Sequence, residues 1–233
     1  MRRLNPGRVA GLWYLLLVLI GPLRLIYIPN TLFVPHDATA TVNNIVAHEW
    51  LFRFGIVADL AGAVVLVMMT LALYRLFEGV SPHLAVQVVI FGGVMPALIY
   101  IVNSVSDAAT LMIVKEPGVL AAFTQPQRDA LAGLFLQLHD HQVTSAEILW
   151  GVWLFPLGTL IYRSGFMPRF LGVWLLINGI AYVALSLTGL LIPERQDALF
   201  FYAQPAFFGE IALVLWLLIK GAIPLRTAGL SLG

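Results

Sequence analysis

The chain has 233 residues, of which 60% are hydrophobic and 11% are charged, and its mean hydropathy is +0.91. A soluble globular protein cannot bury so large an apolar share, so the composition excludes that class and indicates an integral membrane protein. The formal net charge of +1 lacks the basic excess that phosphate binding requires, which excludes nucleic acid as a partner. The absence of cysteine excludes disulfides, thiolate metal ligands and thiol nucleophiles.

Apolar segments of about 20 residues, the length that crosses a ~30 Å hydrocarbon core, recur along the chain and predict about six membrane spans. The first span follows a basic N-terminus, and no small-residue cleavage site comes after it, so we interpret it as a retained signal anchor. Loops rich in proline, glycine and charge separate the spans. The predicted spans cover residues 9–28, 52–76, 84–114, 142–162, 170–192 and 205–219.

No internal repeat and no low-complexity linker divides the chain. The expected fold class is therefore all-α, a polytopic transmembrane helical bundle in which residues 1–233 form a single membrane-embedded domain. Lys and Arg near the span ends set the orientation of such a bundle. With a cytoplasmic N-terminus, the inner side carries Arg2, Arg3, Arg8, Arg75, Arg163, Arg169, Lys220 and Arg226, and the outer side carries Lys115, Arg128 and Arg195. This asymmetry predicts a multi-pass protein of the inner (plasma) membrane with both termini in the cytoplasm.

With this topology, the polar residues within apolar sequence fall in the outer half of the membrane. A charge near the bilayer centre costs at least ~2.5–3.5 kcal/mol, so these side chains should face one another or a water-filled cavity. We therefore predict a polar pocket open to the extracytoplasmic side. The candidate ligand-binding residues are Arg53, Asp59, Asn103, Asp107, His139, Glu147 and Glu210.

Structural explanations compete with a binding role at several of the polar residues within the spans. Arg24 and Arg53 can extend to the outer headgroups. Asp59 and Glu210, each flanked by apolar sequence, can be buried partners of an arginine or protonated acids. On an ideal helix, Arg53 and Asp59 are six residues and roughly 240° apart, so their partners must come from other helices.

The segment LFLQLHDHQ precedes the fourth predicted span. A helix over 130–162 would be about 50 Å long, so we expect residues 130–138 to leave the membrane or bend along its surface. His139, Asp140 and Glu147 are the weak candidates for a metal site here, because the two histidines of an H-x-H pair on a helix point in different directions. A fuller ligand set would require the first outer loop to fold back, bringing in His36, Asp37, His48 and Glu49. We favour a metal-free site and assign no cofactor.

Five motifs in chain order carry a family resemblance: RVAGLWYLLLVLIG, HEWLFRFGIVADL, LFLQLH, YRSGFMPRFLGVWLLINGIAY and GEIALVLWLLIKG. Together they resemble DUF4386, a domain-of-unknown-function family of bacterial multi-span membrane proteins. The resemblance covers nearly the whole chain and implies a multi-span fold without an established activity. The matching motifs contain Arg53, Asp59, His139, the turn at 162–166 and Glu210.

Three functional classes remain. We favour the binding of a small molecule, lipid headgroup or ion in the outer-leaflet pocket. The second class is an intramembrane hydrolase or transferase acting on lipid, metal-dependent in one version, with His139 as base or ligand; no nucleophile motif supports it. The third is a structural or assembly partner of a membrane complex. Membrane lipid is the expected partner, and a homodimer is compatible with the sequence. A transporter is disfavoured because no inverted halves are evident.

Overall fold

In the computed structural model, residues 5–223 are described, and they form helices and turns without any strand. Six helical segments are long and apolar enough to cross a membrane. They are Pro6–Leu32, Glu49–Phe77, Pro82–Lys115, Gln125–Ser164, Arg169–Leu191 and Pro193–Ile219. These segments confirm the all-α, six-span architecture. The sides of the membrane on which the termini lie stay a prediction.

Several of these segments consist of more than one element. The first contains α1 (Pro6–Pro22), a π-helical turn (Leu23–Tyr27) and α2 (Ile28–Leu32), and α3 (Ala38–Ala47) follows it. The second is α4 (Glu49–Phe77), and the third contains α5 (Pro82–Val89), a second π-helical turn (Ile90–Val94) and α6 (Met95–Lys115). The remainder are α7 (Gln125–Val152), α8 (Leu154–Ser164), α9 (Arg169–Leu191) and α10 (Gln196–Ile219).

The fourth segment begins at Gln125, well before the predicted start at residue 142. Hydropathy detects the apolar part of a helix and not its ends, because polar residues also form helix. Residues 130–138 are a packed part of α7, since Ala132 and Leu136 are both buried in apolar clusters. At 1.5 Å per residue, the whole fourth segment, Gln125–Ser164, is about 60 Å long, which is twice the hydrocarbon thickness.

Two compact units make up the chain. Within the described residues, unit 1 contains residues 5–16, Val65–Pro96 and residues 144–223, and unit 2 contains Leu17–Val64 and Ala97–Val143. Several long helices contribute to both units, so the boundary does not fall in loops. The single domain expected from the sequence stays a prediction.

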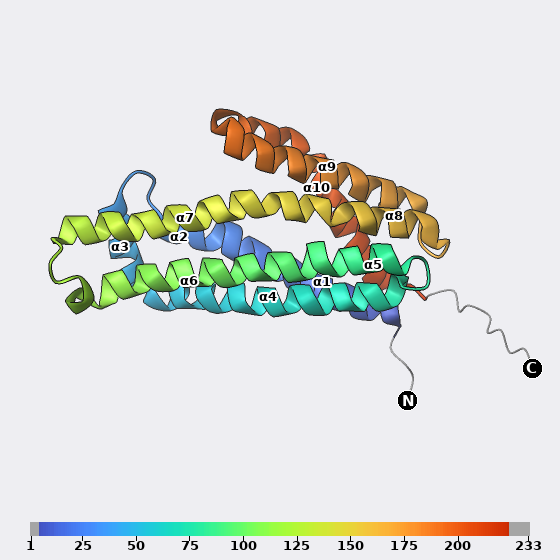
Figure 1. The fold of residues 1–233 in the computed structure, drawn as a ribbon, viewed down its shortest axis with the longest axis horizontal. Helices are drawn as coiled ribbons and strands as arrows, with labels where there is room; N and C mark the ends of the chain where they lie inside the picture. Colours follow the sequence, from blue (N-terminus) through green and yellow to red (C-terminus); the bar gives the residue numbers. More distant parts are fainter. Residues whose placement is uncertain (1–4, 224–233) are drawn as a thin grey trace, which may run out of the picture. The chain divides into compact units, whose positions relative to one another are not determined.

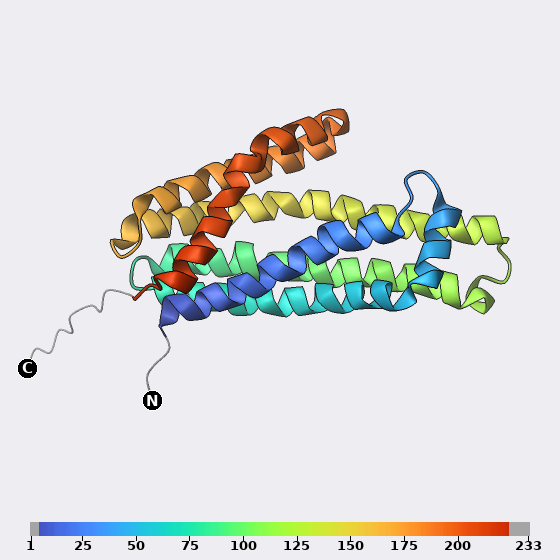
Figure 2. The same ribbon diagram turned by 180° about the vertical axis from the view of Figure 1, so that it is seen from behind.

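Unit 2 has an apolar core built from α2, α3, α4, α6 and α7. In Figures 1 and 2, its parts of α4, α6 and α7 run along one another, with α3 at one end. Asp37 begins α3 by accepting a hydrogen bond from the backbone N–H of Ala40 at 2.8 Å, which satisfies one free donor of the helix end. The core side chains are Ile28, Leu32, Ile45, Phe52, Leu111 and Leu136, with Val42, Ile113 and Ala132 forming a second cluster.

Unit 1 contains helices that approach one another closely at glycines. A Cβ atom on Gly158 of α8 would lie 2.7 Å from the carbonyl oxygen of Gly172 on α9, and a Cβ on Gly172 would lie 2.5 Å from that of Gly158. Gly151 and Gly179 form a second such pair: a Cβ atom on Gly151 would lie 2.5 Å from the carbonyl oxygen of Gly179, and a Cβ on Gly179 would lie 2.9 Å from that of Gly151. Small residues at helix contacts are typical of membrane bundles, in which close packing replaces the hydrophobic driving force.

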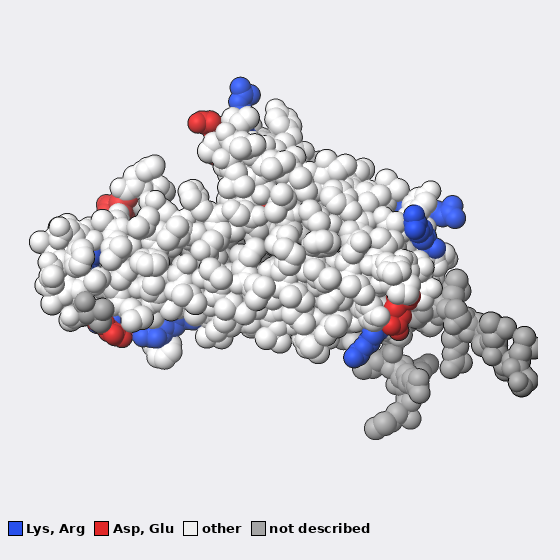
Figure 3. All heavy atoms as spheres, in the orientation of Figure 1, with Lys and Arg blue, Asp and Glu red and all other residues white. Residues whose placement is uncertain are grey.

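Large apolar side chains are exposed along all six segments, including Leu19, Val64, Val105 and Ile180. On the face drawn in Figure 3, most atoms belong to uncharged residues, and the acidic and basic groups are few. An apolar surface of this kind is suited to contact with lipid.

Candidate functional site

Arg24 lies at the centre of a buried group of ionisable side chains in unit 2. Its Nε donates a hydrogen bond to Asp59 Oδ2 at 3.0 Å, and its Nη2 donates to Asp107 Oδ2. The same Nη2 lies 3.2 Å from Nδ1 and 3.0 Å from Nε2 of His139. His139 Nδ1 is in turn 3.1 Å from Asp107 Oδ1. We call these four residues the Arg24 cluster.

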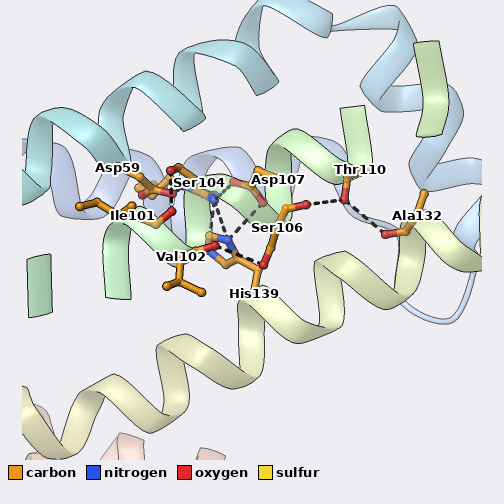
Figure 4. A network of polar contacts seen from close by, with 10 residues as sticks. Asp59, Ile101, Val102, Ser104, Ser106, Asp107, Thr110, Ala132 and His139 are labelled. Carbon is orange, nitrogen blue, oxygen red and sulfur yellow. Dashed lines mark hydrogen bonds and ion pairs between the residues drawn. The ribbon is translucent and has the colours of Figure 1, made fainter. Parts of the chain in front are cut away.

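The members of the Arg24 cluster come from four separate helical segments. Arg24 is on the π-helical turn, Asp59 is on α4, Asp107 is on α6 and His139 is on α7. Figure 4 shows the side chains of Asp59, Asp107 and His139 converging from their helices, with neighbouring hydroxyls along α6. All four are buried, with exposures between 1% and 8%. The cluster therefore ties the interior of unit 2 together through polar contacts.

Local structure makes room for the guanidinium. A Cβ atom on Gly55, one helical turn before Asp59 on α4, would lie 3.8 Å from Arg24 Nε and 3.1 Å from Ile28 Cδ1. A larger side chain at this position would compete with the arginine for space. The π-helical turn also changes the rotation of the helix at Arg24, and such turns often occur at functional sites.

The charges of the cluster do not balance when His139 is neutral. Two carboxylates then face one guanidinium, which leaves one net negative charge among buried groups. Burying an uncompensated charge is costly, whereas a balanced and hydrogen-bonded group is tolerated. One additional positive charge, such as a proton on His139, would bring the cluster to neutrality.

Two further buried acceptors lie on the same helices. Asn103 Oδ1 and Gln142 Oε1 have no hydrogen-bond partner within the described part of the chain. Asn103 is four residues before Asp107, and Gln142 is three residues after His139, so each shares a helix face with a member of the cluster. Acceptors are therefore in excess around the cluster, and a species that brings hydrogen-bond donors would satisfy them.

The other residues proposed from the sequence lie elsewhere. Arg53 is half-exposed and pairs with Glu49 at 2.7 Å, and Lys115 pairs with the same carboxylate at 2.7 Å. The structure therefore pairs Asp59 with Arg24 and not with Arg53. Glu147 and Glu210 belong to unit 1. Asp140 is exposed beside His139.

The loop residues between the first two spans take part in other contacts. His36 occupies a turn with a positive φ of 62°, and Asp37 caps α3. His48 follows the last residue of α3, and Glu49 is held by its two basic partners. Among the described residues, the group with metal-ligand spacing consists of Asp59, Asp107 and His139, so no loop residue takes part in it.

Whether this group suits a metal ion depends on Arg24. One ligand atom from each of Asp59, Asp107 and His139 lies within 4.8 Å of the others, which is close enough for a shared ion. However, the Arg24 guanidinium contacts all three side chains and supplies a positive charge at the same place. A metal would have to displace a permanent cation, so the four residues do not fit a metal while Arg24 stays in position.

Comparison with known proteins gives a family but no activity. A family model described as "Domain of unknown function (DUF4386)" matches residues 9–221. The chain belongs to this family. The DUF4386 match includes all members of the Arg24 cluster. An "Uncharacterized protein" of Archaeoglobus fulgidus is 35% identical over 77 residues, which are 32% of this chain and 43% of that relative. The chain thus spans less than half of that relative's length. No solved structure matches the chain.

The list of candidate site residues did not include Arg24, although it named the three side chains that Arg24 contacts. Its position near the end of a span is equally compatible with extension to lipid headgroups. The sequence feature that could have drawn attention to Arg24 is the neighbouring Pro22, because proline within a helix disturbs the hydrogen-bond ladder.

Proposed function

We propose that this membrane protein binds and releases a proton at the Arg24 cluster, and that it acts as a proton-responsive sensor or carrier. The observation that carries the proposal is the charge count: two buried carboxylates and one imidazole converge on a single guanidinium. A proton is the smallest cation that restores neutrality, and it requires no cavity.

His139 is the member that links the proton to a change of structure. A neutral imidazole has one nitrogen that accepts a hydrogen bond, and Arg24 Nη2 is within reach of the ring nitrogens. Both nitrogens of a protonated imidazole are donors, so Arg24 loses that acceptor and meets a like charge. Asp107, in contact with both groups, then holds the imidazolium through Oδ1. Proton binding thereby weakens the contact between Arg24 and His139, while the hydrogen bond between Arg24 and Asp59 is retained.

The two alternative classes make different demands on the same residues. A lipid hydrolase or transferase needs a reacting group that lipid can reach, whereas the cluster side chains are buried. A purely structural cluster needs only to hold the helices together, and its protonation state would then stay constant. The decisive measurement is therefore the protonation of His139 in the folded protein.

The test is nitrogen NMR of full-length protein labelled at its histidines and reconstituted in lipid nanodiscs. His139→Gln identifies the His139 signals, and His141→Gln, which alters an exposed neighbour on the same helix, is the matched control. We expect the His139 signals to change between neutral and protonated forms with pH while the fold is retained. Constant signals from His139 over the whole range in which the protein stays folded would overturn the proposal.

Elemental analysis of the purified protein completes the test. A stoichiometric metal that is lost in His139→Gln and retained in His141→Gln would overturn proton binding in favour of a metal centre. We expect no such metal to accompany the histidine.

A further inference from the structure

Glu210 forms a second buried polar group, in unit 1. Tyr14 on α1 donates a hydrogen bond from its hydroxyl to Glu210 Oε1. Asn178 on α9 donates from Nδ2 to Oε2 at 3.1 Å. Tyr182, one helical turn after Asn178, is a third hydrogen-bonding partner of the carboxyl. The carboxyl on α10 is thus surrounded by groups from α1 and α9.

This group differs from the Arg24 cluster because it contains no cation. The ion pairs found among the described residues do not include Glu210. The titratable neighbours of Glu210 are the phenols of Tyr14 and Tyr182. The ring of Tyr14 in turn packs against Trp153, with a distance of 6.0 Å between the ring centroids. An ionised carboxylate would here be an uncompensated charge in apolar surroundings.

The partners of Glu210 can satisfy both forms of the carboxyl. A tyrosine hydroxyl donates to a carboxylate oxygen, and it accepts when that oxygen carries a proton. Asn178 Nδ2 donates to Oε2 in either case, because Oε2 remains an acceptor when the proton is on Oε1. Gain or loss of a proton therefore leaves no new unpaired group on the carboxyl.

A further acceptor is available beside the carboxyl. Asn178 is fully buried, and its Oδ1 has no hydrogen-bond partner within the described residues. Nearly all buried polar atoms in proteins have a partner, so an unpaired amide oxygen next to an acid marks a place for a hydrogen-bond donor. A hydrated proton that approaches Glu210 provides such donors.

We infer that Glu210 is a second proton-binding site, at which the neutral acid is the resting form and Tyr14 relays the proton to and from Oε1. On release, the O–H bond of the carboxyl breaks and its proton passes to the Tyr14 oxygen, while the Tyr14 hydroxyl gives its own proton to water, leaving the carboxylate held by Tyr14, Asn178 and Tyr182. This site does not depend on the Arg24 cluster, since its residues lie in unit 1.

Infrared difference spectroscopy of the full-length protein in nanodiscs tests this inference. A protonated carboxyl has a C=O stretching band that disappears on ionisation. We expect one such band to be absent from Glu210→Gln and retained in Glu194→Gln, which alters an exposed glutamate. Asp59→Asn and Asp107→Asn should also retain it, which separates this result from the outcome for His139.

Tyr14→Phe provides a second variant in case Glu210→Gln fails to fold. This change removes the hydroxyl partner of Oε1, so the carboxyl band of protein labelled with carbon-13 glutamate should shift in frequency. Raising the pH should remove the band from the wild type and release one more proton per molecule than from Glu210→Gln. The inference is overturned if the band is absent at every pH at which the protein is folded, if it never responds to pH, or if Tyr14→Phe leaves it unshifted.

Discussion

Arg24 and Asp59 are joined by a hydrogen-bonded ion pair of 3.0 Å across 35 positions of the chain. Arg24 also reaches Asp107 on α6, so one guanidinium links the π-helical turn to two other helices. Removing Arg24 leaves two buried carboxylates without their cation. The cluster should consequently respond to substitution as a unit.

A double-mutant cycle on Arg24 and Asp59 should show strong coupling. Arg24→Gln should destabilise the detergent-solubilised protein by about 3–5 kcal/mol, because it leaves two buried carboxylates without their cation, whereas Asp59→Asn should cost less because Arg24 stays paired with Asp107. The double variant should cost less than the sum of the two. Reversible unfolding followed by circular dichroism provides the three free energies. Additive losses would show that the two side chains do not interact in the folded protein.

Arg53→Ala should behave differently from Arg24→Gln. Arg53 and Lys115 share the carboxylate of Glu49, and both basic side chains are substantially exposed, at 46% and 40%. Exposed ion pairs contribute little because water and salt screen them. The unfolding midpoint of Arg53→Ala should therefore lie close to that of the wild type. A loss as large as that of Arg24→Gln would mean that Arg53 belongs to the buried site.

Gly172→Ala should destabilise the protein, whereas Gly21→Ala should not. A Cβ atom at Gly172 would lie 2.5 Å from the Gly158 carbonyl oxygen, so backbone must move, at a cost of about 1–3 kcal/mol. At Gly21, no atom lies within 4 Å of the added Cβ, and alanine should stabilise the helix by roughly 0.5–1 kcal/mol. Thermal unfolding of the two variants in the same detergent gives the comparison. Equal effects would contradict the close contact of α8 and α9.

Reporter fusions should locate the loops on opposite sides of the membrane. We expect cytoplasmic signals after Gly79 and Gly165 and external signals near Gly118 and Gln196, in accordance with the excess of Lys and Arg on the inner side. In unit 1, the rings of Phe77 and Phe166 stack with centroids 5.7 Å apart. The loops that contain Gly79 and Gly165 therefore lie next to each other and should give the same signal. The reverse pattern of signals would transfer the predicted site to the inner leaflet.

The number of spans could be predicted because a hydrocarbon layer imposes a minimum apolar length that is visible in the sequence. Asp59, Asp107 and His139 could be named because polar groups in apolar sequence are costly and need partners. The partner Arg24 could not be identified, since lipid-facing and core-facing positions of a span are both apolar, and periodicity does not reveal which face is buried. Arg53 was named as a candidate instead, although it is half-exposed and pairs with Glu49, because the sequence does not show which contacts form between helices. The roles of all these residues stay predictions.

The π-helical turn Leu23–Tyr27 has a consequence for chain length. Its hydrogen bonds close one residue further along than those of an α-helix, so the turn is equivalent to a one-residue insertion. Because the wider turn takes up the extra residue, deleting one residue within it would restore a regular α-helix and leave Ile28 and Leu32, which follow the turn, on the buried face that they occupy now. Only the residues within the turn, Arg24 among them, would change their position on the helix. An insertion of this kind and the arginine that it presents should therefore be gained or lost together.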